Sequence, residues 1–306
     1  MRIAIMGTGG VGGYFGAKLA QAGNDVTFIA RGGHLAALRE RGLVVESGVS
    51  PLHLARVQAT DDPAEVAPVD AVMFCVKLWD VEAAARQVEP LVSNGGVVIP
   101  FQNGLAAPEI LQRTLGPARV LGGVAYIAAT IKAPGVIAHT GTMARLRVGA
   151  FADGPAAPAA AFVDACRAAG IEVELSPDIR RALWEKFCFL CALSGCTSVA
   201  RQPVGGIRGD PDLRATFEAA VREGWEVGRA QGVALADDFV AAQMKALDGL
   251  PAEMRSSMQN DLAGGRRLEA PWLSGAVAAL AKQEGVAAPV SGVLYAALKP
   301  YVAGTA

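Results

Sequence analysis

The chain has 306 residues and a net charge of −1, with 52% hydrophobic and 19% charged residues. This length and composition allow one large or two moderate domains with a sizeable core. The near-neutral charge gives no general attraction to nucleic acid or to membranes, and no apolar run approaches the ~20 residues that span a bilayer. The N-terminal apolar run is interrupted too early for a signal peptide, so we expect a cytoplasmic protein.

The five cysteines and three histidines follow neither a disulfide pattern nor a metal-binding pattern. The cysteine count is odd, and the spacing matches no disulfide framework. Cys188 and Cys191 form a C-x-x-C pair, but they lie inside the apolar stretch 187–193. We interpret both as small buried core residues. The histidines are scattered without ligand spacing, so no metal is expected.

A glycine-rich turn lies between two short apolar runs at the start of the chain. The order is an apolar run over 2–6, the turn, a helical pattern over 14–21 and a second apolar run over 25–30. In this strand–turn–helix–strand context a G-x-G-x-x-G match indicates a dinucleotide site. The turn consists of Gly7, Thr8, Gly9, Gly10, Val11 and Gly12.

Each glycine of the fingerprint has a physical role. Gly7 permits the tight turn, Gly9 lets the backbone approach a pyrophosphate, and Gly12 lets the helix pack close to the strand. The helix N-terminus offers N–H groups to the phosphates. The motif therefore predicts that this segment binds a dinucleotide.

The residue after the second strand selects the cofactor. An acidic residue usually stands there and holds the ribose 2′-hydroxyl, but this chain has Ala30 and Arg31. A guanidinium suits a 2′-phosphate through its planar set of donors. We therefore predict NADP(H) rather than NAD(H). The competing interpretation of Arg31 is a solvated loop residue.

Further polar residues follow the next two predicted strands. Apolar runs over 70–76 and 96–101 predict buried strands, with a helix from Val81 to Leu91 between them. This alternation predicts a parallel sheet with helices on both faces. Lys77 follows the first run and Asn103 the second. Ligands bind beyond the carboxyl ends of such strands, so both residues and Arg31 are expected at one sheet edge.

The character of the chain changes near residue 177. Residues 120–148 are strand-like with turns, and a helix over about 157–169 and a short strand over 171–175 follow. After Pro177 the pattern is almost entirely helical. We predict an α/β fold with a Rossmann-type doubly wound sheet over 1–177, followed by an all-helical C-terminal domain over 178–306. The cleft between the domains is the expected active site.

The helical half carries polar residues that stand out from their surroundings. Trp184, Glu185 and Lys186 are predicted to start a strongly apolar helix. A buried lysine costs free energy unless it is paired or shifts its pKa. Further on, residues 256–258 and Glu269 supply polar groups at helix-length spacing. The competing interpretation of Lys186 is a surface lysine whose stem alone is buried.

Taken together, these motifs resemble the ketopantoate reductase (2-dehydropantoate 2-reductase) family over essentially the whole chain. The resemblance implies a Rossmann domain followed by a helical domain, and NADPH-dependent reduction of a 2-keto acid to a 2-hydroxy acid. The segments that carry it, in the order and close to the spacing of the family, are the glycine motif with Arg31, Cys75-Val76-Lys77, Gln102-Asn103-Gly104, Trp184-Glu185-Lys186, Ser256-Ser257-Met258 and Glu269.

The resemblance also implies roles for single residues. Lys186 matches the proton donor, which would stabilise the charge that develops on the keto oxygen. Asn103 matches an asparagine that holds cofactor and substrate, and Ser257 a serine that binds the substrate carboxylate. Glu269 matches a glutamate that faces the site, where it would orient the lysine or contact the cofactor. Two further matches to cofactor positions are Lys77 and Ala128.

The chain departs from the family on the expected substrate side. Asparagines that typically stand four and eight residues after the lysine are replaced by Leu190 and Ser194, and another asparagine by Val204. Positions 186, 190 and 194 share one helix face. A site that lacks such amides discriminates less well for a polar substrate, often by a factor of about 10².

Several functions therefore stay open. The leading hypothesis is reduction of 2-dehydropantoate to pantoate, a step of pantothenate biosynthesis, and the close rival is a 2-keto acid with a more apolar side chain. A non-catalytic NADPH-binding regulator and a relative of the β-hydroxyacid dehydrogenases are the alternatives. Several short hydrophobic helices could form a homodimer interface, although none is singled out.

Overall fold

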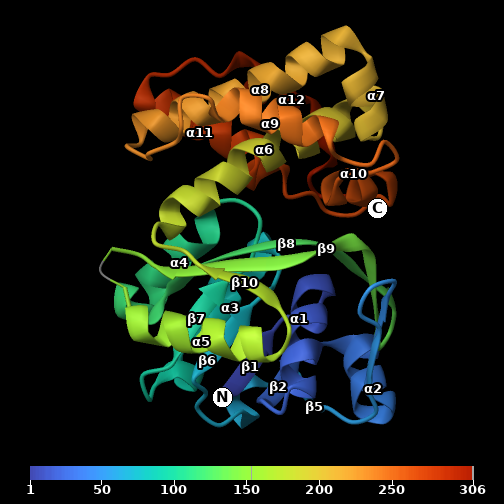
Figure 1. Cartoon of the computed structure of the whole chain (residues 1–306), viewed down its shortest axis with the longest axis vertical. Coiled ribbons are helices and arrows are strands. Elements are labelled where there is room, and N and C mark those ends of the chain that lie inside the picture. Colours follow the sequence, from blue (N-terminus) through green and yellow to red (C-terminus); the bar gives the residue numbers. More distant parts are fainter. Residues whose placement is uncertain (153, 305–306) are drawn as a thin grey trace. The chain divides into compact units, whose positions relative to one another are not determined.

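A computed structural model describes residues 1–152 and 154–304 of the chain (Figure 1). The residues separate into two compact units. Unit 1 comprises Met1–Gln102 and Ala106–Ala182, and unit 2 comprises Asn103–Leu105 and Leu183–Ala306. The division lies a few residues beyond the predicted boundary at 177/178, and it places Asn103 with the helical half. Neither point follows from composition, because both depend on tertiary contacts.

Unit 1 is built around a five-stranded parallel sheet in the order β5-β2-β1-β6-β7. The strands are β1 (Arg2–Met6), β2 (Asp25–Ile29), β5 (Gln58–Thr60), β6 (Ala71–Phe74) and β7 (Val97–Pro100). The near-continuous apolar sequences of β1, β6 and β7 fit strands that are covered on both faces. The predicted Rossmann-type sheet is confirmed, although β6 and β7 are shorter than the apolar runs over 70–76 and 96–101.

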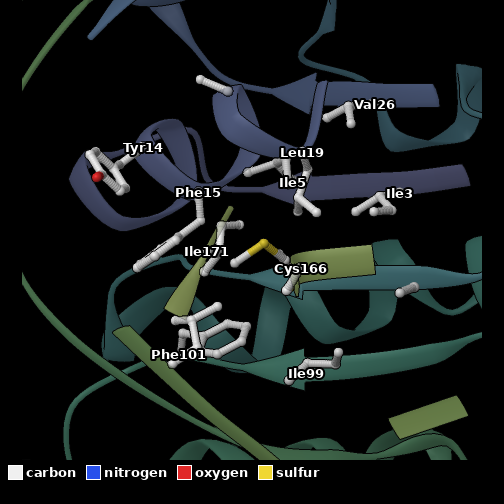
Figure 2. Packing of buried hydrophobic residues seen from close by; sticks show 14 of the residues in the cluster. Ile3, Ile5, Tyr14, Phe15, Leu19, Val26, Ile99, Phe101, Cys166 and Ile171 are labelled. Carbon is white, nitrogen blue, oxygen red and sulfur yellow. The ribbon is translucent and has the colours of Figure 1, made fainter. Parts of the chain in front are cut away.

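The helices of unit 1 pack around this sheet. They are α1 (Gly10–Gln21), α2 (Gly32–Arg41), α3 (Val81–Val88), α4 (Ala106–Leu115) and α5 (Ala156–Ala168). Figure 2 shows Ile5 of β1, Phe15 of α1 and Cys166 of α5 among the side chains that fill the core. The predicted helix from Val81 to Leu91 ends at Val88, because Pro90 cannot continue the hydrogen-bond ladder.

Unit 1 also contains a second sheet, which the sequence did not predict. The long hairpin β8 (Leu121–Ala133) and β9 (Val136–Ala150) is joined by β10 (Glu172–Leu175), β3 (Leu43–Ser47) and β4 (Leu52–Leu54), in the order β10-β9-β3-β4 with β8 paired to β9. The pattern over 120–148 indicates strands but not their partners. Pairing of β3 with β9 joins segments about 90 residues apart, which periodicity cannot reveal.

Unit 2 is helical. Its helices are α6 (Ile179–Ala200), α7 (Val204–Gly209), α8 (Pro211–Ala230), α9 (Phe239–Asp248), α10 (Ser257–Ala263), α11 (Ser274–Glu284) and α12 (Pro289–Leu298). The 3₁₀ turns of the chain are Pro63–Glu65, Leu78–Asp80, Pro90–Val92, Pro117–Arg119, Ala270–Trp272 and Lys299–Tyr301. The predicted all-helical C-terminal region is confirmed. Among the described residues, no helix combines the length and apolar character needed to cross a membrane.

The helices α8 and α6 both start directly after an aspartate whose carboxylate caps the first turn. The side chain of Asp210 accepts hydrogen bonds from the first amides of α8, as expected for Asp before Pro at a helix start. The prediction that the apolar helix starts at Trp184 is wrong, because α6 already begins at Ile179. Asp178 supplies the missed signal, since its carboxylate accepts from the Arg181 amide at 3.0 Å.

Candidate active site

The first part of the glycine turn is tied to the end of β2. The amides of Gly7 and Thr8 both donate to the carbonyl of Ile29, at 3.2 and 3.1 Å, and the Thr8 hydroxyl donates to the same oxygen at 3.1 Å. Gly7 has φ +98°, a backbone conformation that favours glycine. These two residues therefore shape the turn, and the amides left to meet a phosphate are those of the first turn of α1.

Close backbone approaches require glycine at Gly10 and Gly12 but not at Gly9. A Cβ on Gly10 would collide with the Ala129 carbonyl of β8, and one on Gly12 with the Gly7 carbonyl. A Cβ on Gly9, in contrast, would meet nothing within 4 Å. The start of α1 is thus held rigidly, with open space beside Gly9. An oxygen of a pyrophosphate fits such a cradle at a helix N-terminus.

Ala128 lies close to this cradle. It is exposed on β8, at a register shift between Ile127 and Ala129 in the pairing with β9. The next residue, Ala129, is the one whose backbone meets Gly10. A β-bulge typically re-aims the backbone beside a site. The sequence places Ala128 in a strand-like stretch but gives no sign of the bulge.

Two cations follow strands β2 and β6. Arg31 is the exposed N-cap residue of α2, and its guanidinium makes no hydrogen bond or ion pair within residues 1–152 and 154–304. Lys77 is also exposed, and its Nζ lies 5.6 Å from the centroid of the Trp79 ring. Both side chains are therefore placed where solvent or a ligand can reach them.

Gln102 fastens the loop that contains Lys77. Its Nε2 donates to the carbonyls of Phe74 and Val76, at 3.1 and 3.0 Å. The end of β6 is thereby tied to the residue before Asn103. Gln102 belongs to the Gln102-Asn103-Gly104 segment that carries the family resemblance, but sequence reasoning assigned it no role of its own.

In unit 2, Lys186 and Asn103 are brought into direct contact. The Lys186 Nζ of α6 donates to Asn103 Oδ1 at 2.8 Å. The next residue, Gly104, turns the chain with φ +87°, a conformation that favours glycine. A Cβ at this position would also lie too close to the Trp272 carbonyl. The fold thus brings the two side chains together, although they are 83 positions apart in the sequence.

The environment of Lys186 changes its acidity. Burial lowers the pKa of its ammonium from 10.5 to about 8, and the negative charge of Glu269 opposes part of this shift. The lysine is therefore charged near neutral pH but gives up a proton more readily than a solvated lysine. Glu269 is the residue before the turn Ala270–Trp272, so the same segment supplies both this charge and the Trp272 backbone near Gly104.

The residues that replace the family's asparagines are placed differently from one another. Leu190 is partly buried one helical turn after Lys186 on α6. Ser194 is fully buried, and its hydroxyl has no hydrogen-bond partner among the described residues. Val204 is also fully buried, inside the hydrophobic core of unit 2. Leu190 and Ser194 therefore share the side of the lysine, whereas Val204 contributes to packing.

Ser257 is the exposed first residue of α10, and its neighbour Ser256 is buried and caps that helix. The Ser256 hydroxyl accepts from the Gln259 amide at 3.1 Å and lies 2.8 Å from the hydroxyl of Thr197 on α6. Thr197 was not recognised from the sequence, where one threonine in an apolar helix carries no signal.

Among the described residues, the cysteines and acidic residues do not form a metal centre. Cys188 and Cys191 are buried and free, which confirms their interpretation as core residues. Within the part of the chain that the structure describes, no group of three or more His, Cys, Asp or Glu could hold a metal ion.

Comparison with known proteins identifies the family of the chain. Residues 3–153 match the family Ketopantoate reductase PanE/ApbA, and residues 178–302 match its C-terminal counterpart. The chain is 31% identical to the 2-dehydropantoate 2-reductase of Halobacterium salinarum over 291 residues, which cover 95% of each chain.

Solved structures agree with this assignment. The crystal structure of a 2-dehydropantoate 2-reductase from Geobacter metallireducens superposes with a TM-score of 0.92 at 30% identity, covering 98% of this chain and 99% of that one. A ternary structure of D-mandelate dehydrogenase with NADH and anilino(oxo)acetate has a TM-score of 0.90 at 21% identity, over 99% and 98% of the two chains, and so shares the fold. The present chain belongs to the ketopantoate reductase PanE/ApbA family of oxidoreductases.

Proposed function

We propose that this protein uses NADPH to reduce 2-dehydropantoate to pantoate, with Lys186 as the proton donor. The observation that carries the proposal is the contact between Lys186 Nζ and Asn103 Oδ1 at 2.8 Å, made by an ammonium whose pKa is lowered to about 8. A general acid is most effective when its pKa lies near the working pH.

The bound NADPH would supply the hydride. Lys186 Nζ then donates a proton to the keto oxygen and is left as a neutral amine, which its desolvated environment favours. Since Asn103 Oδ1 accepts from the lysine, its Nδ2 hydrogens remain to donate to a carbonyl of the substrate or cofactor. The exposed Ser257 hydroxyl would bind the substrate carboxylate.

The cofactor proposal rests on unit 1. The open space beside Gly9 and the amides of α1 would receive the pyrophosphate, and Arg31 would pair with the 2′-phosphate. Lys77 and Ala128 would complete the cofactor contacts.

A second candidate is a 2-keto acid with a more apolar side chain. The partly buried Leu190 favours it, because this residue presents an aliphatic group on the Lys186 side of α6. Steady-state reduction of 2-dehydropantoate and of branched and aromatic 2-keto acids separates the candidates. Leu190→Asn should raise kcat/KM for 2-dehydropantoate and lower it for the apolar acids if the second candidate is correct, by about 10-fold or more.

The experiment that tests the reductase itself is a comparison of Lys186→Ala with Lys245→Ala, an exposed lysine on α9. The first should lose about 10²- to 10⁴-fold in kcat, with the dissociation constant of NADPH changed little, and the second should match the wild type. Unchanged turnover in Lys186→Ala contradicts the role of the lysine. NADPH binding by the wild type without turnover of any 2-keto acid would favour a non-catalytic regulator.

A further inference from the structure

Three buried groups form a directed chain of hydrogen bonds between α6 and α10. The Thr197 hydroxyl donates to the Leu193 carbonyl at 2.6 Å and lies 2.8 Å from the Ser256 hydroxyl, which accepts from the Gln259 amide at 3.1 Å. Because the Thr197 hydrogen is already used, Ser256 must donate to Thr197. The Ser256 hydroxyl therefore has both a fixed donor and a fixed acceptor, and its position is determined by Thr197.

Burial makes this arrangement specific. Thr197 is 0% and Ser256 3% exposed, so water does not replace either partner. Two neighbours of Thr197 on α6, Ser194 and Ser198, also bury their hydroxyls but have no partner for them among the described residues. The hydroxyl at position 197 is thus the one on this stretch of α6 that connects the helix to α10.

Helix geometry relates this connection to the proton donor. Thr197 follows Lys186 by 11 positions, which is about three turns and about 16 Å along α6, so both side chains leave the same face. Ser257, the proposed ligand of the substrate carboxylate, comes directly after Ser256. A fixed Ser256 therefore fixes the backbone from which the Ser257 hydroxyl projects, relative to the helix that carries Lys186.

We propose that Thr197 is a positioning residue for substrate binding, which acts through Ser256 to hold the Ser257 hydroxyl in register with Lys186. This inference rests on the proposed function, in which Ser257 binds the carboxylate of a 2-keto acid. Thr197 itself would touch neither substrate nor cofactor. Its effect is expected in the KM of the 2-keto acid and not in the chemical step.

Thr197→Val tests the role, because valine keeps the shape and removes the hydroxyl. We expect the KM of the 2-keto acid to rise about 10-fold, with kcat and the dissociation constant of NADPH within about 2-fold, and Thr197→Ser to restore the wild-type KM. Thr114→Val on α4 is the matched control, since the Thr114 hydroxyl also donates to the carbonyl four residues earlier, at 2.9 Å, within unit 1. Ser256→Ala removes the other hydroxyl of the same hydrogen bond. The KM of this variant tests the role if Thr197→Val does not fold.

A general loss of stability would not distinguish substrates, so the corresponding 2-keto amide serves as the discriminating probe. The loss in Thr197→Val should be larger for the carboxylate substrate than for the amide, because a hydrogen bond to an ionised acceptor is stronger. It should not add to the loss in Ser257→Ala in a double-mutant cycle. Equal losses for acid and amide, full additivity or an unchanged KM in Thr197→Val would overturn the role of Thr197 alone. Ser257→Ala with an unchanged KM would overturn the roles of both residues, whereas a wild type inactive toward all 2-keto acids would overturn the proposed function.

Discussion

The protonation state of Lys186 sets the pH range in which the protein can act as a reductase. Its ammonium has a pKa lowered to about 8 by burial, with Glu269 acting in the opposite direction. The proton donor is therefore present below this pKa and is lost above it. We expect kcat for reduction to be level near neutral pH and to fall above about pH 8, and kcat for oxidation of the 2-hydroxy acid to rise there.

Substitution of Glu269 provides a second test of the pH dependence assigned to Lys186. Glu269→Gln removes the charge that favours the ammonium, so the descending limb of the reductive pH profile should move to lower pH. The measurement is kcat against pH for both variants with saturating substrates. Coincident limbs in the two proteins would show that the limb does not report Lys186.

Arg31 is the residue on which cofactor preference depends in our proposal. Its guanidinium is exposed and makes no hydrogen bond or ion pair within residues 1–152 and 154–304. Loss of a charge-assisted bond to the 2′-phosphate should cost about 1.5–3 kcal/mol. Arg31→Ala should therefore weaken NADPH binding about 10- to 100-fold while NADH binding changes little, as measured by fluorescence titration.

Arg39→Ala is a suitable control for this experiment, because Arg39 is an exposed arginine later on the same helix and pairs with Asp61. It should bind both cofactors like the wild type. An equal loss of NADH and NADPH affinity in Arg31→Ala would show that the arginine serves another purpose.

At the residue scale, sequence reasoning predicts side chains but not their surroundings. Lys186 and Asn103 stand out because each lies beside an apolar segment, yet nothing in the sequence shows that they share a hydrogen bond. Gln102 and Thr197 were missed for the same reason. Their importance lies in the groups they bond, and those groups are remote in the chain or belong to the backbone.

At the scale of elements, α8 secures the start of α12. The carboxylate of Glu223, only 6% exposed, accepts from the amides of Val290 and Ser291, both at 2.7 Å. These are first-turn amides that lack acceptors within the helix. Leu294 of the same helix packs over Gly195 of α6, where a Cβ would lie 2.9 Å from its Cδ1. A single carboxylate thus helps to place the helix that packs against the middle of α6.

Removal of this charge should destabilise the protein measurably. Glu223→Gln places an amide NH₂ where one backbone N–H must be accepted, so we expect a loss of about 2–3 kcal/mol in the free energy of unfolding. Glu226→Gln, one turn further along α8, should change it by less than about 0.5 kcal/mol. Chemical denaturation followed by circular dichroism measures both. Equal midpoints for the two variants would contradict the role of Glu223 as a cap.

Element type was predictable where one signal dominates, and element pairing was not. The parallel sheet follows from alternating apolar runs and helices, and the start of α8 coincides with an Asp before a Pro, Asp210 and Pro211, which is typical of a helix N-terminus. The second sheet depends on β3 and β9, whose pairing is set by tertiary contacts. Val204 illustrates the same limit, since replacement of an expected amide suggested a changed substrate contact, whereas its side chain lies in the core of unit 2.

At the scale of the whole molecule, each unit has its own hydrophobic core and its own buried thiols. Cys166 belongs to the core of unit 1, and Cys188, Cys191 and Cys196 belong to that of unit 2. Burial raises the pKa of Cys166 and Cys196 to about 12. In the folded state these thiols are therefore both inaccessible to reagents and protonated, and so unreactive. Modification of each thiol therefore reports opening of the unit that contains it.

Cofactor binding should slow thiol modification to different extents in the two cores. The glycine turn and Arg31 lie in unit 1, so NADPH at about 100 times its dissociation constant should slow modification of Cys166 about 100-fold, because it stabilises the closed unit by about 2.7 kcal/mol. The thiols of unit 2 should be slowed less, since their core contains none of the proposed phosphate contacts. Peptide mass spectrometry after timed alkylation resolves the sites, and the same NADPH concentration should protect Cys166 less in Arg31→Ala. Equal slowing in both cores would mean that the units open together, and no slowing of Cys166 would contradict cofactor binding by unit 1.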